Sequence, residues 1–147
     1  MAWVDGLKGQ IVALDTAPLI YFIEEHPLYL PIVEPFFTAL DAGVFQVVTS
    51  TLTLLEVLVQ PLRQDNRSLA DLYATILLEA AGVTTLPITA PIATRAAQLR
   101  AAQTISTPDA LQLATALAAG ATVFVTNDLR LKPLPQLQMI AIDSVNE

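Results

Sequence analysis

The sequence contains no cysteine, and histidine occurs only once, at His26. The absence of cysteine excludes a disulfide scaffold, a thiol nucleophile and thiolate metal sites. A single histidine excludes zinc sites built from several imidazoles. Any metal site in this chain must therefore use oxygen ligands, which favour hard cations such as Mg²⁺ or Mn²⁺.

Charged residues are also scarce, at 14% of the 147 residues, and bases are scarcer than acids. Seven lysines and arginines against 14 acidic residues give a formal net charge of −7. No basic field over the whole molecule can attract nucleic acid, so a nucleic-acid substrate would need local bases or bound cations. The 54% of hydrophobic residues argues against disorder and predicts a single domain over residues 1–147 with a sizeable core.

The chain lacks a long hydrophobic run. Its longest apolar stretch, residues 113–125, is shorter than the roughly 20 residues that a membrane-spanning helix needs. The first ten residues lack the basic start and apolar core of a signal peptide. We therefore expect a cytoplasmic protein without a membrane anchor, in which residues 1–10 form an N-terminal extension of unknown role.

Short apolar runs alternate with helical patterns along the chain. The predicted strands cover residues 11–14, 44–49, 83–88, 122–125 and 139–142. The predicted helices cover residues 17–23 after a Thr16 cap, 31–42, 51–59 with a stop at Pro61, 68–81, 90–102 and 107–120. Apolar strands separated by helices predict a three-layer α/β/α fold with a central, mainly parallel sheet of about five strands. In such a sheet, ligands bind beyond the carboxyl ends of the strands.

Four acidic residues lie at positions where this fold would bind a ligand. Asp15 follows the first predicted strand, Asp128 follows the fourth, Asp109 lies in the first turn of a helix, and Glu56 lies in an apolar helical stretch. Each alone has an ordinary explanation as a cap, a turn or a solvated side chain. If they cluster, their mutual repulsion raises their pKa values unless a cation lies among them. A divalent cation would also lower the pKa of a bound water and stabilise the leaving oxygen of a phosphodiester.

The segments around these acids resemble the PIN-domain family and, within it, the VapC-like toxins. The matching segments are Val-Ala-Leu-Asp15-Thr, Thr-Leu-Leu-Glu56-Val, Thr-Pro-Asp109-Ala-Leu-Gln and Val-Phe-Val-Thr126-Asn127-Asp128. The resemblance covers residues 11–142. It implies a Mg²⁺- or Mn²⁺-dependent endoribonuclease that cleaves RNA, a small antitoxin protein as partner, and a homodimer.

The resemblance also implies a role for each matching residue. Asp15 and Asp109 correspond to direct metal ligands. Glu56 and Asp128 correspond to acids that complete the pocket, either directly or through water. The pair Thr126–Asn127 corresponds to polar residues that support the fourth acid.

Local bases are few near the matching segments. Arg130 and Lys132 follow the fourth acid and are candidates for contacts with a substrate phosphate, although an ordinary solvated loop explains them equally simply. The segment 106–108, just before Asp109, carries no base, whereas family members often have bases near the pocket.

Other functions remain open at this level. A non-catalytic PIN-fold binding module would fit the acidic composition, and metal titration distinguishes it from an enzyme. A housekeeping RNA-processing nuclease without an antitoxin would share every motif. An aspartyl-phosphate enzyme is disfavoured because Ala17 stands where its second aspartate would be. A nucleotide-binding oxidoreductase is disfavoured because no G-x-G-x-x-G segment follows the first strand.

Overall fold

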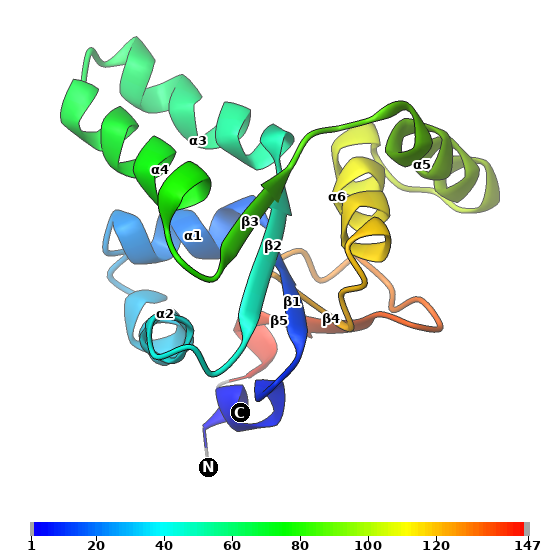
Figure 1. Ribbon diagram of the computed structural model, residues 1–147, viewed down its shortest axis with the longest axis horizontal. Coiled ribbons are helices and arrows are strands. Elements are labelled where there is room, and N and C mark those ends of the chain that lie inside the picture. The colour runs from blue at the N-terminus through cyan, green and yellow to red at the C-terminus, as the bar shows by residue number, and fades with distance from the viewer. Residues whose placement is uncertain (1, 146–147) are drawn as a thin grey trace.

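The structure is a computed structural model that describes residues 2–145. In this part of the chain, five strands form one sheet in the order β3-β2-β1-β4-β5, and every pairing is parallel (Figure 1). The strands are β1 (Ile11–Leu14), β2 (Gln46–Ser50), β3 (Val83–Leu86), β4 (Val123–Thr126) and β5 (Gln138–Ala141). The predicted parallel sheet is confirmed.

Helices cover both faces of this sheet. They are α1 (Thr16–Ile23), α2 (Leu30–Asp41), α3 (Thr51–Arg63), α4 (Arg67–Glu79), α5 (Ala90–Ala102) and α6 (Thr107–Ala118), with short 3₁₀ helices η1 (Trp3–Leu7) and η2 (Ile142–Ser144). Figure 1 shows α1 to α4 on one side of the strands and α5 with α6 on the other. The predicted three-layer α/β/α architecture is therefore confirmed.

The two-residue period of the strands divides the core into two clusters. On β1, Val12 and Leu14 pack in the cluster that includes side chains of α1 to α4, whereas Ala13 between them packs in the cluster of α5 and α6. The central strands β1 and β4 are almost wholly buried, but the edge strands β3 and β5 are only half-buried. A continuous apolar run in the sequence therefore describes the buried central strands better than the half-buried edge strands.

The first ten residues belong to this core, although we predicted only an extension there. Val4 and Leu7 of η1 are buried, and the Trp3 ring stacks on Phe36 of α2 with their centroids 5.7 Å apart. Burial of these apolar side chains fixes the segment against α2. Within residues 2–145, none of the helices combines the length and apolar character needed to cross a bilayer.

One predicted helix end and one predicted cap are wrong. The helix α3 does not stop at Pro61 but continues to Arg63. Pro61 is buried in the last part of the helix, and its carbonyl accepts a hydrogen bond from the Asn66 N–H at 2.8 Å. The packing of the proline ring and this hydrogen bond at the end of the helix compensate for the backbone N–H that proline lacks. The N-cap of α1 is Asp15 and not Thr16, which lies inside the helix.

Candidate active site

The strand order places a crevice next to β1. From β1 the chain first adds β2 and β3 on one side, and later adds β4 and β5 on the other. The carboxyl ends of β1 and β4 therefore flank a topological switch point, where parallel sheets bind their ligands. Asp15 directly follows β1, and Thr126 ends β4.

A pocket of about 330 Å³ opens at this place, and three of the four predicted acids line it. Asp15 caps the start of α1, Glu56 lies in α3, and Asp109 lies in the first turn of α6. The remaining lining residues are Thr16, Ala17, Ile20, Pro108 and Gln112. Three carboxylates that are far apart in the sequence thus lie around one small space.

Asp15 is held by hydrogen bonds to both carboxylate oxygens. Its Oδ1 accepts from the Thr16 N–H at 2.8 Å, and its Oδ2 accepts from the Thr126 hydroxyl at 2.7 Å. Burial raises the pKa of Asp15 above its ordinary value, and the negative charges of Asp109 and Glu56 raise it further, although both hydrogen bonds act in the opposite direction. A positive charge in the pocket would favour the ionised form of Asp15.

A network of side-chain hydrogen bonds, buried around Gln112 and exposed at Glu56, joins the helices that carry the acids. The Thr16 hydroxyl donates to Glu56 Oε1 at 2.7 Å, which joins α1 to α3. The amide of Gln112 in α6 donates from Nε2 to the Thr53 hydroxyl at 2.7 Å and accepts from the Ser50 hydroxyl at 2.8 Å, which joins α6 to α3. Gln112 lies one helical turn after Asp109, so these bonds also set the position of that carboxylate.

Sequence reasoning did not single out Gln112. A signal was present, because a glutamine three residues after Asp109 lies on the same helix face within an otherwise apolar stretch. Its side chain is buried, and a buried amide needs partners on a neighbouring element.

Asp128 lies outside the set of residues that line the acid pocket. Its carboxylate pairs with Arg130, with Oδ1 accepting from Nε and Oδ2 from Nη2, both at 2.9 Å. The hydrogen bonds and charge of Arg130 hold the pKa of Asp128 below its ordinary value. The other predicted base, Lys132, is exposed. The fourth predicted acid is therefore paired with Arg130 and is not among the residues that line the pocket of the other three.

Asn127 connects the end of β4 to two other elements. Its amide nitrogen donates to the Tyr21 hydroxyl of α1 at 3.0 Å, and its amide oxygen accepts from the Asp143 N–H of η2 at 2.9 Å. Thr126 meanwhile bonds Asp15 and also accepts from the Asp128 N–H at 3.0 Å. Thr126 therefore contacts the backbone of the fourth acid, whereas the Asn127 side chain contacts α1 and η2 and not Asp128.

Comparison with known proteins identifies the family. The family model described as PIN domain matches residues 12–136. The chain belongs to the PIN domain family. No curated protein matches the chain.

Solved structures share the fold of this PIN domain at low sequence identity. A chain of VapBC2 from Rickettsia felis, solved bound to a promoter DNA fragment, is 21% identical with a TM-score of 0.66, over 89% of this chain and 98% of that one. A chain of DNA-bound VapBC from Salmonella typhimurium is 23% identical with a TM-score of 0.65, over 92% and 98%. VapC20 of Mycobacterium tuberculosis, named as a toxin that cleaves the sarcin-ricin loop, is 18% identical with a TM-score of 0.63, over 77% and 86%.

The donor set of the PIN-domain pocket suits a hard cation. Among residues 2–145, no group of three or more acidic or histidine side chains has the spacing of a ready-made metal site. Mg²⁺ nevertheless needs only one or two direct carboxylates and keeps several waters, for which a pocket of about 330 Å³ leaves room. Burial raises the pKa of Asp15 most, the charges of Asp109 and Glu56 raise it further, and a cation would relieve their repulsion. Asp15, Asp109 and Glu56 thus fit a site with few direct ligands.

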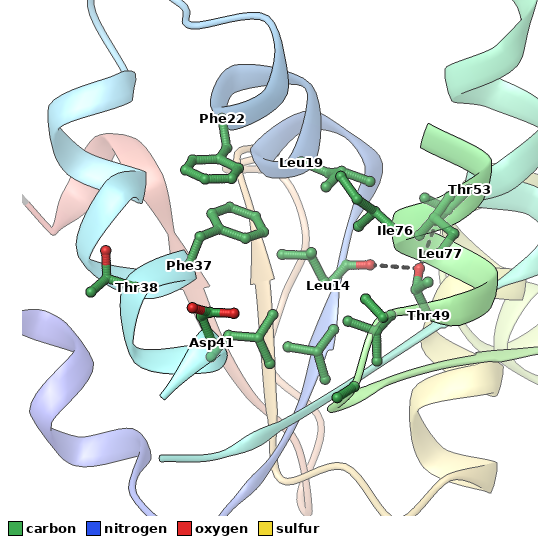
Figure 2. A pocket seen from close by; sticks show the side chains of 15 residues that line it. Leu14, Leu19, Phe22, Phe37, Thr38, Asp41, Thr49, Thr53, Ile76 and Leu77 are labelled. Atoms are coloured by element: carbon green, nitrogen blue, oxygen red, sulfur yellow. Dashed lines mark hydrogen bonds between the residues drawn. The ribbon is translucent and has the colours of Figure 1, made fainter. Parts of the chain in front are cut away.

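A second pocket of similar size, about 340 Å³, lies among α1, α2, α4 and the sheet. Figure 2 shows Phe22, Phe37, Leu14 and Leu77 pointing into it, with Asp41 at one side as the one charged residue among those lining it. An apolar lining with a single carboxylate fits apolar groups and not a hydrated cation or a phosphodiester. Of these two pockets, the acid pocket has the lining that suits a cation.

Proposed function

We propose that this PIN domain is a divalent-metal-dependent endoribonuclease and the toxin of a toxin–antitoxin pair. The observation that carries the proposal is the meeting of Asp15, Glu56 and Asp109 in one pocket at the switch point of the sheet. The fold shared with VapC20, a protein named for cleaving the sarcin-ricin loop, supports RNA as the substrate class.

The contacts suggest a division of roles among the pocket residues. Asp15 and Asp109 would hold Mg²⁺ or Mn²⁺ directly, and Glu56 would act through a water. The Thr126 hydroxyl orients the Asp15 carboxylate, and the Thr16 hydroxyl orients that of Glu56. When bound, the cation would supply an activated water and neutralise the charge that develops on the phosphate.

Cleavage of labelled RNA tests this function. We expect cleavage with Mg²⁺ or Mn²⁺ and none with EDTA, and we expect Asp15→Asn and Asp109→Asn to abolish it while both proteins remain folded. Asp71→Asn is the matched control, because Asp71 is an exposed acid on α4 away from the pocket. Unchanged cleavage by both pocket variants would reject the proposal. A DNA strand of the same sequence tests the preference for RNA.

A protein partner is the second part of the proposal. Exposed leucines on α3 and α4, namely Leu55, Leu62, Leu72 and Leu78, form a surface that is unusually apolar for a solvated helix pair. We propose that a homodimer contact covers part of it and that an antitoxin, as in the VapBC complexes, binds the chain. The mass of the purified chain in solution tests the dimer. Co-purification with the product of a small neighbouring gene tests the antitoxin, and its absence would favour a housekeeping nuclease.

A non-catalytic PIN-fold module is the second candidate function. The net charge of −7 and the absence of a base in segment 106–108 favour it, because both weaken the attraction of RNA to the acid pocket. Such a module would show no gain in melting temperature with Mg²⁺ or Mn²⁺, whereas the proposed enzyme gains stability from either cation.

A further inference from the structure

The fourth predicted acid and the nearest base form one unit. Asp128 and Arg130 are joined by two side-chain hydrogen bonds of 2.9 Å, and the Arg130 N–H of the backbone adds a third to Asp128 Oδ1 at 3.0 Å. Both oxygens of the carboxylate are thus occupied by one residue. A carboxylate paired in this way is a poorer ligand for a cation, because its charge is already balanced.

The arginine keeps free donors despite this pairing. A guanidinium has five N–H groups in a planar fork. The pairing uses one on Nε and one on Nη2, so both N–H groups of Nη1 and the second of Nη2 remain. The Arg130 side chain is 87% exposed, whereas the side chain of Asp128 is only 20% exposed. The half-buried carboxylate of Asp128 therefore holds the exposed guanidinium of Arg130 through two hydrogen bonds.

The unit is anchored beside the acid pocket by a single hydroxyl. Thr126 Oγ1 accepts from the Asp128 N–H at 3.0 Å and donates to Asp15 Oδ2 at 2.7 Å. One oxygen atom therefore links the turn that carries Arg130 to the carboxylate that we place on the metal. The hydrogen bonds and charge of Asp128 raise the pKa of Arg130, and the negative charge of Asp109 raises it further.

We propose that Asp128 acts through Arg130, holding its guanidinium toward the acid pocket so that the free N–H groups bind a phosphate of the RNA, and that Asp128 is not a metal ligand. The inference rests on the ribonuclease function proposed above. It gives an acidic chain the local positive charge that its substrate requires. Arg130 is then a substrate-binding residue, and Asp128 is a positioning residue.

The coupling between the two side chains tests the proposal. We would measure kcat and KM for RNA cleavage in Asp128→Asn, Arg130→Ala and the double variant, together with the melting temperature as a function of Mn²⁺. Each single variant is expected to raise KM or lower kcat/KM by about tenfold to a hundredfold, as for a lost charge-assisted hydrogen bond, and the double variant is expected to add nothing further. The dependence of melting temperature on Mn²⁺ is expected to stay as in the unmodified chain.

Two further variants separate geometry from charge. Arg130→Lys keeps the charge but not the two-pronged pairing, so it should behave almost like Arg130→Ala. Arg95→Ala removes an exposed arginine of α5 that does not line the acid pocket, and it should leave kcat/KM unchanged. Wild-type behaviour of Arg130→Lys would show that charge alone matters and would overturn the positioning role of Asp128.

The other outcomes overturn the proposal as well. A loss of Mn²⁺ stabilisation in Asp128→Asn alone would make Asp128 a metal ligand. Faster cleavage by Arg130→Ala would show that the Asp128–Arg130 pair inhibits the reaction. Unchanged cleavage kinetics in both single variants would show that the pair is only a surface ion pair. Binding of a fluorescent single-stranded RNA in Ca²⁺ separates this inference from the proposed function. If the chain does not cleave RNA, equal and non-additive losses of RNA affinity would still support the inference, and unchanged affinity would reject it.

Discussion

Replacing Gln112 with leucine should loosen the framework that holds the acid pocket. Gln112 is 4% exposed and joins α6 to α3 through hydrogen bonds of 2.7 Å to Thr53 and 2.8 Å to Ser50. Both partners keep another hydrogen bond, Thr53 with Thr49 and Ser50 with the Leu52 N–H, so the variant leaves neither fully unpaired. Two lost buried hydrogen bonds at about 0.5–1.5 kcal/mol each give a destabilisation of about 1–3 kcal/mol.

Thermal and urea unfolding measure this effect. For a domain of this length, about 2–4 °C of melting temperature corresponds to 1 kcal/mol, so we expect a decrease of about 2–12 °C. Gln98→Leu is the control, because Gln98 is an exposed glutamine on α5 and its replacement should change stability by less than about 0.5 kcal/mol. Equal stabilities of the Gln112→Leu variant and the unmodified chain would refute the structural role of this network.

Three further predictions follow from the acid pocket and the core. First, Mn²⁺ at about 100 times its dissociation constant should stabilise the chain by about 2.7 kcal/mol, and Asp15→Asn should remove this gain; equal gains in both proteins would place the ion elsewhere. Second, because the folded-state pKa of Asp15 is raised, its ionisation destabilises the metal-free fold as pH rises from the ordinary value of 3.8 through the raised pKa. Asp15→Asn should therefore gain stability over the unmodified chain at neutral pH in EDTA, and this difference should shrink in acid; a difference independent of pH would contradict the reasoning. Third, Leu77→Ala should destabilise the core by about 2–5 kcal/mol in urea unfolding, whereas Leu78→Ala, at a site 58% exposed on the same helix, should have little effect.

Most of the fold could be predicted from the sequence because local patterns and tertiary packing agree. The run Ile11–Leu14 and the segment 122–125 read as buried strands, and both lie at the centre of the sheet, as β1 and β4. The end of α3 was not predicted, because the burial of Pro61 inside the helix depends on tertiary packing, which a local sequence pattern does not show. The packing of η1 against α2 could not be predicted from the sequence either, because it depends on a tertiary contact between Trp3 and Phe36.

The candidate site was only partly predictable for a related reason. The positions of Asp15 and Asp109 follow from strand ends and helix starts, which a single sequence reveals. Whether the four acids converge depends on side-chain partners, and here Asp128 pairs with Arg130, two residues later, and does not line the pocket of the other three. The contact between Gln112 and α3 depends in the same way on how α6 packs against its neighbour.

The position of a bound cation tests the central claim most directly. Crystals of the chain soaked in Mn²⁺ would reveal the ion by its anomalous scattering, independently of any assay of activity. The account predicts an anomalous peak in the pocket between Asp15 and Asp109, with Glu56 nearby and Asp128 still paired with Arg130. A pocket without such a peak at saturating Mn²⁺, or a peak only at other carboxylates, would contradict it.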